Sequence, residues 1–133
     1  MKTKLFIFLT FFSLIIVGCV KHDTPEMDLT YPPVIVTDSV TCNSTIFATV
    51  YGTVVDLGDP VLTTCGICFD TIVTPTTSDS VKTIIPDEGV QFNCLLYGLT
   101  PNTKYYVRTF AVSDIGTSYG QEYSFRTYPP DKK

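Results

Sequence analysis

The sequence has 133 residues, which is enough for one domain and too few for two ordinary ones. Its formal charge is −4, and Lys and Arg are scattered along the chain, so binding to nucleic acid through clustered basic residues is not expected. Hydrophobic residues make up 44% of the chain and aromatic residues 13%, which predicts a packed core. Thr, Val and Tyr are abundant and favour strands, so we expect an all-β protein.

The N-terminal segment has the layout of an export signal. Lys2 and Lys4 form a short cationic start, and an apolar stretch follows over residues 5–17. A transmembrane helix needs about 20 apolar residues. The segment from Leu5 to Val20 has only 16 residues and is short for a membrane span.

The end of this segment resembles the lipobox of bacterial lipoproteins, in which two aliphatic residues and a small one precede the Cys at the cleavage point. The matching residues are Ile16, Val17, Gly18 and Cys19. The resemblance implies that residues 1–18 are a signal peptide and that Cys19 receives a diacylglycerol and usually an N-acyl group, because one acyl chain alone holds a protein only weakly. A plain secretory signal or a retained helix is the alternative.

Removal of Lys2 and Lys4 with the signal leaves 7 basic and 13 acidic side chains, a net charge of −6. Residues 19–33 are charged, contain three prolines and few apolar residues, and are expected to form a solvated tether that carries the only His, His22. A folded domain is predicted over residues 34–128, with a C-terminal tail at 129–133.

Short runs rich in β-branched and aromatic residues recur after this tether and alternate with turn signals. This pattern predicts a sandwich with seven strands, the number in an immunoglobulin-like fold. The expected strands are 34–38, 44–54, 65–71, 81–85, 90–96, 104–113 and 118–127. Thr74 to Ser80 is expected to be an exposed connection.

The stretch from Gly98 to Arg108 resembles the corner before strand F of fibronectin type III domains, where Leu, Pro, Thr and Tyr follow at a spacing of two. The matching residues are Leu99, Pro101, Thr103 and Tyr105. The resemblance implies a fibronectin type III β-sandwich in which the Tyr105 hydroxyl bonds to nearby backbone.

Further segments at 51–54, 66–69 and 119–127 are similar to strands of this family, the second of them in the variant of Bacteroidetes surface proteins. The chain has no Trp, which many family members carry in the core. We expect a Phe or a Tyr to fill that volume, and Phe47, Phe69 and Phe92 are available.

Alternation along the strands predicts which side chains face the core. The expected core residues are Ile46, Ala48, Val50, Phe92, Cys94, Leu96, Leu99, Tyr105, Val107 and Ala111. Tyr106, Arg108 and Phe110 then point to the opposite side and form a candidate contact face, with an ordinary solvent-facing strand as the alternative.

Cys65 and Cys68 match the C-x-x-C pattern of redox pairs and zinc sites. Residues three apart in a strand point to opposite faces, and the only His lies in the tether, so neither function is expected. Cys68 and Cys94 are interpreted as small core residues. A structural Cys42–Cys65 disulfide is the alternative that an oxidising compartment would favour.

Catalysis is also not expected, because the predicted domain has no His for a nucleophilic triad and its acidic residues fall mostly in loops. Asp56 with Asp59, or Asp87 with Glu88, could contribute to a calcium site, but neither pair follows the calcium-loop pattern. No metal and no cofactor are predicted.

Taken together, the sequence predicts a lipid-anchored outer-membrane protein of a Gram-negative bacterium of Bacteroidetes type, on the periplasmic or cell-surface face. It is interpreted as a non-catalytic binding or spacer module, with the membrane as one partner through Cys19 and a protein or glycan as another. The alternatives are an accessory lipoprotein for glycan capture and a structural partner of an outer-membrane complex.

Overall fold

The computed structural model describes residues 29–85 and 88–131, so the predicted signal peptide, Cys19, His22 and Asp87 lie outside the described residues. Within the described ranges the chain forms eight strands and no helix, and so contains no helix that could cross a membrane. The strands are β1 (Val34–Thr41), β2 (Phe47–Asp56), β3 (Thr64–Asp70), β4 (Ser80–Ile84), β5 (Gln91–Tyr97), β6 (Lys104–Ser113), β7 (Gly116–Tyr119) and β8 (Tyr123–Arg126).

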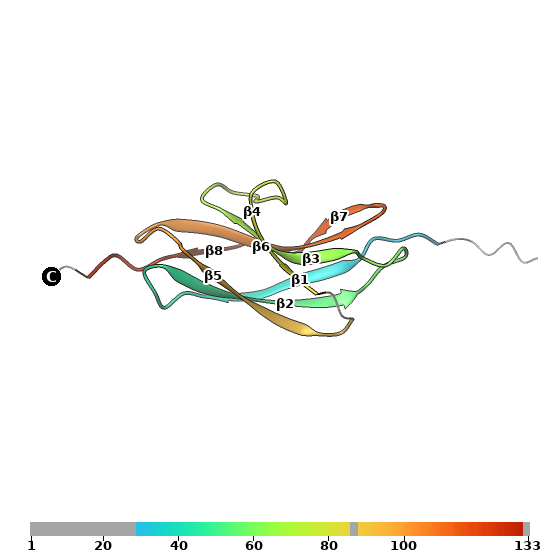
Figure 1. Ribbon diagram of the computed structural model, residues 1–133, viewed down its shortest axis with the longest axis horizontal. Coiled ribbons are helices and arrows are strands. Elements are labelled where there is room, and N and C mark those ends of the chain that lie inside the picture. Colours follow the sequence, from blue (N-terminus) through green and yellow to red (C-terminus); the bar gives the residue numbers. More distant parts are fainter. Residues whose placement is uncertain (1–28, 86–87, 132–133) are drawn as a thin grey trace, which may run out of the picture.

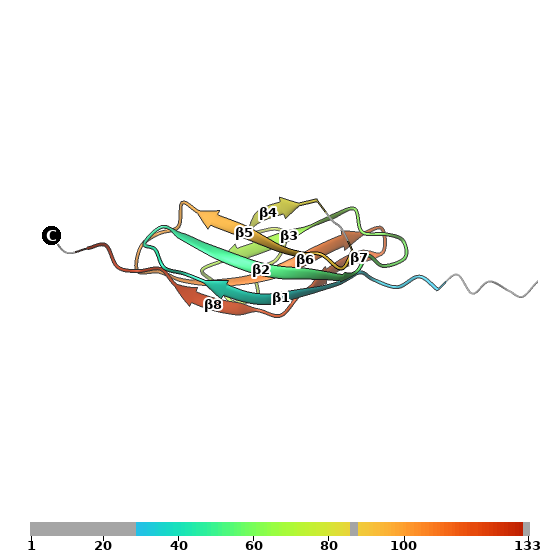
Figure 2. The same ribbon diagram turned by 90° about the horizontal axis from the view of Figure 1, so that it is seen from below.

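The strands form two antiparallel sheets that pack face to face (Figures 1 and 2). The first sheet has the order β1-β2-β5, and the second has the order β4-β3-β6, with β7 and β8 both paired to β6. The described chain enters at one end of the long axis and leaves at the other (Figures 1 and 2).

The expected last strand is divided in two, which gives eight strands rather than seven. β7 pairs with the end of β6 and β8 pairs with its beginning. Between β7 and β8, Gly120 lies very close to β6 and β1. A Cβ at Gly120 would lie 2.1 Å from Thr109 Oγ1 and 2.8 Å from the Thr37 backbone nitrogen. The strand is therefore interrupted where β1 of the first sheet touches the second.

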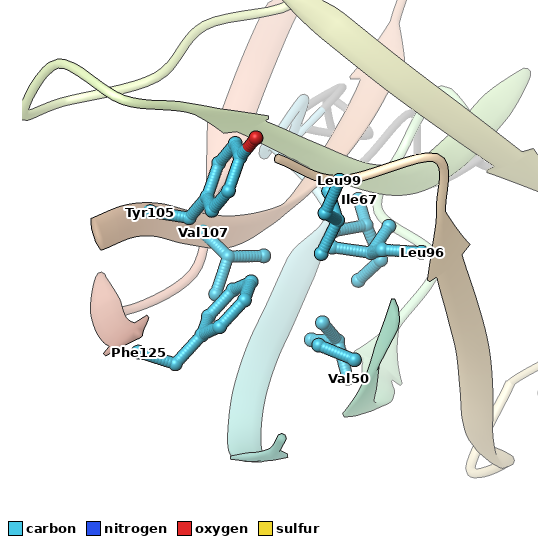
Figure 3. Close-up of a cluster of buried hydrophobic side chains, with 8 residues drawn as sticks. Val50, Ile67, Leu96, Leu99, Tyr105, Val107 and Phe125 are labelled. Carbon is cyan, nitrogen blue, oxygen red and sulfur yellow. The ribbon is translucent and has the colours of Figure 1, made fainter. Parts of the chain in front are cut away.

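The core between the sheets consists of two clusters. The larger one contains Ala48, Val50, Ile67, Leu96, Leu99, Tyr105, Val107 and Phe125 (Figure 3). The smaller one contains Ile35, Val54, Leu62, Cys65 and Ala111. Most of the expected core residues are thus buried, and Phe92 and Cys94 are half-buried because β5 is an edge strand.

One expected core residue is exposed, and one of the three Phe residues available to replace the missing Trp is excluded. Ile46 is 51% exposed, because β2 begins at Phe47 and Ile46 belongs to the preceding bend, where its carbonyl accepts a hydrogen bond from Leu99 N–H. Phe47 is 43% exposed and does not replace the missing Trp, whereas Phe69 and Phe92 pack against the core clusters.

Candidate functional site

Tyr105 holds the corner between β5 and β6. Its ring is buried and stacks on Phe125 at a centroid distance of 5.6 Å, and its hydroxyl accepts a hydrogen bond of 2.9 Å from Thr100 N–H. Leu99 is buried beside it and Pro101 is half-buried. This is the geometry of a tyrosine corner, and it stabilises the fold rather than forming a ligand site.

The outer face of the second sheet carries the residues expected to form a contact face. Tyr106 and Arg108 are half-buried, and Phe110 is only 3% exposed, so the expectation that Phe110 faces solvent is wrong. Phe110 pairs with Gly66 and Tyr119, and the β4 backbone at Lys82 approaches Gly66 so closely that no side chain fits there. The loop of residues 71–79, which joins β3 to the edge strand β4, lies over this side of the sheet (Figure 1).

Arg108 holds the 71–79 loop on the sheet. Its Nε donates a hydrogen bond of 2.5 Å to the carbonyl of Pro75, and its guanidinium carbon lies 3.8 Å from the centre of the Tyr119 ring. The Tyr119 hydroxyl in turn accepts a hydrogen bond of 3.2 Å from Thr77 N–H. Two adjacent strands thus fix the middle of the loop through a cation–π pair and hydrogen bonds.

Further contacts fix the rest of the loop. Thr74 N–H donates to Glu122 Oε2 at 2.5 Å, Thr76 N–H donates to Asp79 Oδ2 at 2.7 Å, and the Pro75 ring is fully buried. Thr74 has a φ of 62°, a left-handed conformation that is uncommon for a residue other than Gly. Such strained positions persist only where surrounding contacts impose them.

The beginning of the same loop presents two aliphatic side chains to solvent. Ile72 is 68% exposed and Val73 is 56% exposed. The residues before and after them are hydrogen-bonded, so these side chains lie on a well-fixed backbone. Preorganised apolar groups lose little conformational entropy when a partner covers them.

Neither the loop geometry nor its role could be read from the motifs in the sequence. Ser, Thr and Pro over residues 74–80 indicated an exposed connection, whereas the structure buries Pro75 against β3 and β6. The one available signal was the pair Ile72 and Val73, two adjacent aliphatic residues that follow a strand and precede a turn-forming segment.

The two cysteines of the C-x-x-C pattern point to opposite faces of β3, as expected. Cys65 lies in the core, where burial raises its pKa to about 11. Cys68 lies on the outer face below the loop, its thiol donates to the Pro75 carbonyl at 3.4 Å, and burial raises its pKa while Arg108 opposes this shift. Cys68 is fully buried, as expected of a small core residue, but it lies under the 71–79 loop and outside the two clusters between the sheets.

The described cysteines, Cys42, Cys65, Cys68 and Cys94, are all free. The alternative of a Cys42–Cys65 disulfide is wrong, because Cys42 packs against the larger core cluster and Cys65 belongs to the smaller one. Burial also raises the pKa of Cys94, which lies near Lys82.

Asp56, one of the acidic residues considered for a calcium site, makes a local contact. Asp56 Oδ1 accepts a hydrogen bond of 2.8 Å from Gly58 N–H and so shapes its own turn. Within residues 29–85 and 88–131, no three His, Cys, Asp or Glu side chains come together in a way that could hold a metal ion.

No protein-family model matches this sequence, and no curated protein matches it significantly. Among solved structures, the sensor domain of the anti-sigma factor RsgI4 of Pseudobacteroides cellulosolvens has a TM-score of 0.57 and 15% identity, over 75% of this chain and 98% of that one. The FN1–FN3 domains of chicken CNTN1 have a TM-score of 0.55 and 20% identity, over 74% of this chain and 31% of that one. A fibronectin type III domain of a human protein has a TM-score of 0.47 and 24% identity, over 78% and 88%.

These likenesses establish the fold: the described residues form an all-β sandwich like that of fibronectin type III domains and of the bacterial sensor domain. Leu99 and Tyr105 are buried in this sandwich, and the Tyr105 hydroxyl is bonded to the backbone of Thr100. A shared fold does not define a ligand, so the function must be argued from surfaces of this chain.

Proposed function

We propose that this protein is a non-catalytic binding module held at the bacterial outer membrane through a lipid on Cys19. The observation that carries the binding role is the 71–79 loop, which is fixed to the second sheet and presents Ile72 and Val73 to solvent. A pure spacer domain has no need of a loop with these constraints. The likeness to a sensor domain is consistent with a module that detects or holds a partner.

The chemistry of the loop favours a protein partner with an apolar recess. Ile72 and Val73 offer aliphatic surface, while the carboxylates of Asp70, Asp79 and Glu122 accept hydrogen bonds from loop residues and add negative charge around it. Basic residues at the rim of such a recess would complement these carboxylates. The proposed site thus combines an apolar centre with a charged rim, as binding interfaces often do.

The proposed anchor complements this arrangement. The described chain begins at one end of the long axis (Figure 1). The expected end of the tether at residue 33 is wrong, because Tyr31 is hydrogen-bonded to Asp59 and Pro33 is buried against the domain. The proposed tether between Cys19 and Tyr31 would attach the sandwich to the membrane by one end and leave the sides of both sheets open to partners. Whether the domain faces the periplasm or the cell exterior is decided by export of the lipoprotein.

Membrane fractionation and mass spectrometry test the anchor. The wild-type protein should be recovered with the outer membrane, start at Cys19 and carry acyl chains, whereas Cys19→Ala should not be acylated. Protease treatment of intact cells then separates surface exposure from a periplasmic location. A mature protein that still contains residues 1–18 contradicts the proposed anchor.

Crosslinking followed by co-purification tests the binding role. A stoichiometric partner should be recovered with the wild-type protein and lost when Ile72→Ser and Val73→Ser are combined. Val61→Ser is the matched control, because Val61 is 58% exposed in a different loop and its change should leave recovery intact. Equal recovery with all three proteins would show that the 71–79 loop does not bind the partner.

A further inference from the structure

β5 is an edge strand whose outer side has unpaired backbone groups. Among the strands that the structure describes, it pairs only with β2. Val54 N–H donates to the Val90 carbonyl, and the Val54 carbonyl accepts from Gly89 N–H, so the backbone groups of Val54 face β5. The direction of the backbone N–H and C=O groups alternates along an antiparallel strand. The backbone groups of Gly52, Val50 and Ala48 therefore also point toward β5.

The register then assigns the two sides of β5. Gly52, Val50 and Ala48 lie opposite Phe92, Cys94 and Leu96, which therefore bond to β2. The N–H and C=O groups of the alternate residues point away from the sheet along its free edge. These residues are Gln91, Asn93, Leu95 and Tyr97.

The other edge strands of the described domain are protected. β1 lies against the second sheet, where Thr109 N–H donates to Thr37 Oγ1 and Gly120 closes on the Thr37 backbone. β4 carries a charge at Lys82, and β7 and β8 have only four residues each. Edge strands usually avoid pairing with other chains in one of three ways: they contact another sheet, carry a charged residue or are short.

β5 has none of these protections. Its seven residues include no charged side chain and no Pro. Leu95 is 50% exposed and Tyr97 is 64% exposed, and the neighbouring Phe47 pairs with Tyr97 across the sheet. The ammonium of Lys82 lies 4.0 Å from the centre of the Tyr97 ring and covers only this end of the strand.

We propose that β5 pairs with β5 of a second copy of this chain, antiparallel about a twofold axis, so that the two three-stranded sheets become one sheet of six strands. The chain is acidic, so like charges oppose most contacts between two copies, and an uncharged strand is where a second copy meets least repulsion. The uncharged β5 places no like charges opposite each other when it pairs with itself. The same pairing brings Leu95 and Tyr97 of both copies onto one face. This inference does not depend on the lipid anchor.

Sedimentation equilibrium of the mature chain with Cys19→Ala tests the pairing without any lipid. We expect a reversible monomer–dimer equilibrium. Asn93→Pro removes a free-edge donor and should leave the hydrogen bonds to β2 intact, and Leu95→Lys adds a charge to the exposed face. Each should weaken dimerisation at least tenfold.

Val36→Lys is the matched control, since Val36 is 38% exposed on β1 of the same sheet, and this variant should dimerise like the parent. Circular dichroism checks that every variant is folded. If Asn93→Pro unfolds, hydrogen exchange of the parent protein takes the place of that variant as the test. The backbone amides of Asn93 and Leu95 should then become more protected from exchange as protein concentration rises. A parent that stays monomeric at all concentrations, or a dimer unaffected by Leu95→Lys, overturns the proposal.

Discussion

The guanidinium carbon of Arg108 lies 3.8 Å from the centre of the Tyr119 ring, and Arg108 Nε also bonds to the carbonyl of Pro75 in the loop above. One side chain therefore joins β6, β7 and the 71–79 loop. Because Arg108 is half-buried, water does not fully screen these interactions. The loop should depend on this residue more than on any local turn contact.

Arg108→Ala should release the 71–79 loop while leaving the sandwich folded. The variant loses a cation–π pair and a charge-assisted hydrogen bond, and we expect its free energy of unfolding to fall by about 1–3 kcal/mol. Hydrogen exchange of Thr74 and Thr77 should become faster. Arg126→Ala is the control, since Arg126 is exposed and bonds only to the Asn102 carbonyl. Unchanged exchange at Thr74 and Thr77 would refute this role of Arg108.

Tyr105→Phe isolates the hydrogen bond of the tyrosine corner. The substitution keeps the ring on Phe125 but leaves Thr100 N–H without its acceptor, and the expected loss is about 1–2 kcal/mol. Chemical denaturation measures it. Tyr128→Phe should change stability by less than about 0.5 kcal/mol, because Tyr128 is 52% exposed. Equal effects of the two changes would mean that the Tyr105 hydroxyl contributes nothing specific.

The strands could be predicted because β-branched and aromatic alternation is a local property of the sequence. Residues 104–113 match β6 at both ends, and the corner residues mark its start. The interruption at Gly120 could not be predicted, because it depends on Thr37 and Thr109, which lie far away in the sequence. Ile46 shows the same limit at a strand end, where alternation continues in the sequence but the sheet does not.

The candidate site could be predicted only in part, for a related reason. Alternation correctly separated Tyr106, Arg108 and Phe110 from the core side of β6, but it carries no information about what covers the opposite side. The bond between Arg108 and Pro75 spans 33 positions, and the bond between Thr74 and Glu122 spans 48. These contacts join residues of the second sheet and its connections that are far apart in the sequence, so a local pattern does not reveal them.

Gly120→Ala should destabilise the domain by about 1–3 kcal/mol or more, because its Cβ would lie 2.1 Å from Thr109 Oγ1. Thermal unfolding gives the size of this effect. Thr109→Ala removes that oxygen, so adding Gly120→Ala to it should cost less than adding it to the wild type. Strictly additive effects would show that the two residues do not clash.

Cys65 predicts a specific loss of stability at alkaline pH. Its pKa is raised from the ordinary value of 9.0 to about 11 by burial. Between these two pKa values the folded state keeps a proton that the unfolded state has released. The free energy of unfolding therefore falls as pH rises from about 9 to about 11. Below pH 9 the contribution of the Cys65 thiol to stability is fully present. Cys65→Ala should lower stability at neutral pH because it leaves a small cavity, yet its stability should fall less steeply above pH 9. Urea denaturation of both proteins measures how steeply the free energy of unfolding falls with pH.

Cys68 and Cys94 also have raised pKa values, so some decline in stability above pH 9 should remain in the Cys65→Ala variant. Parallel slopes for variant and wild type would show that the Cys65 thiol does not titrate as its burial requires.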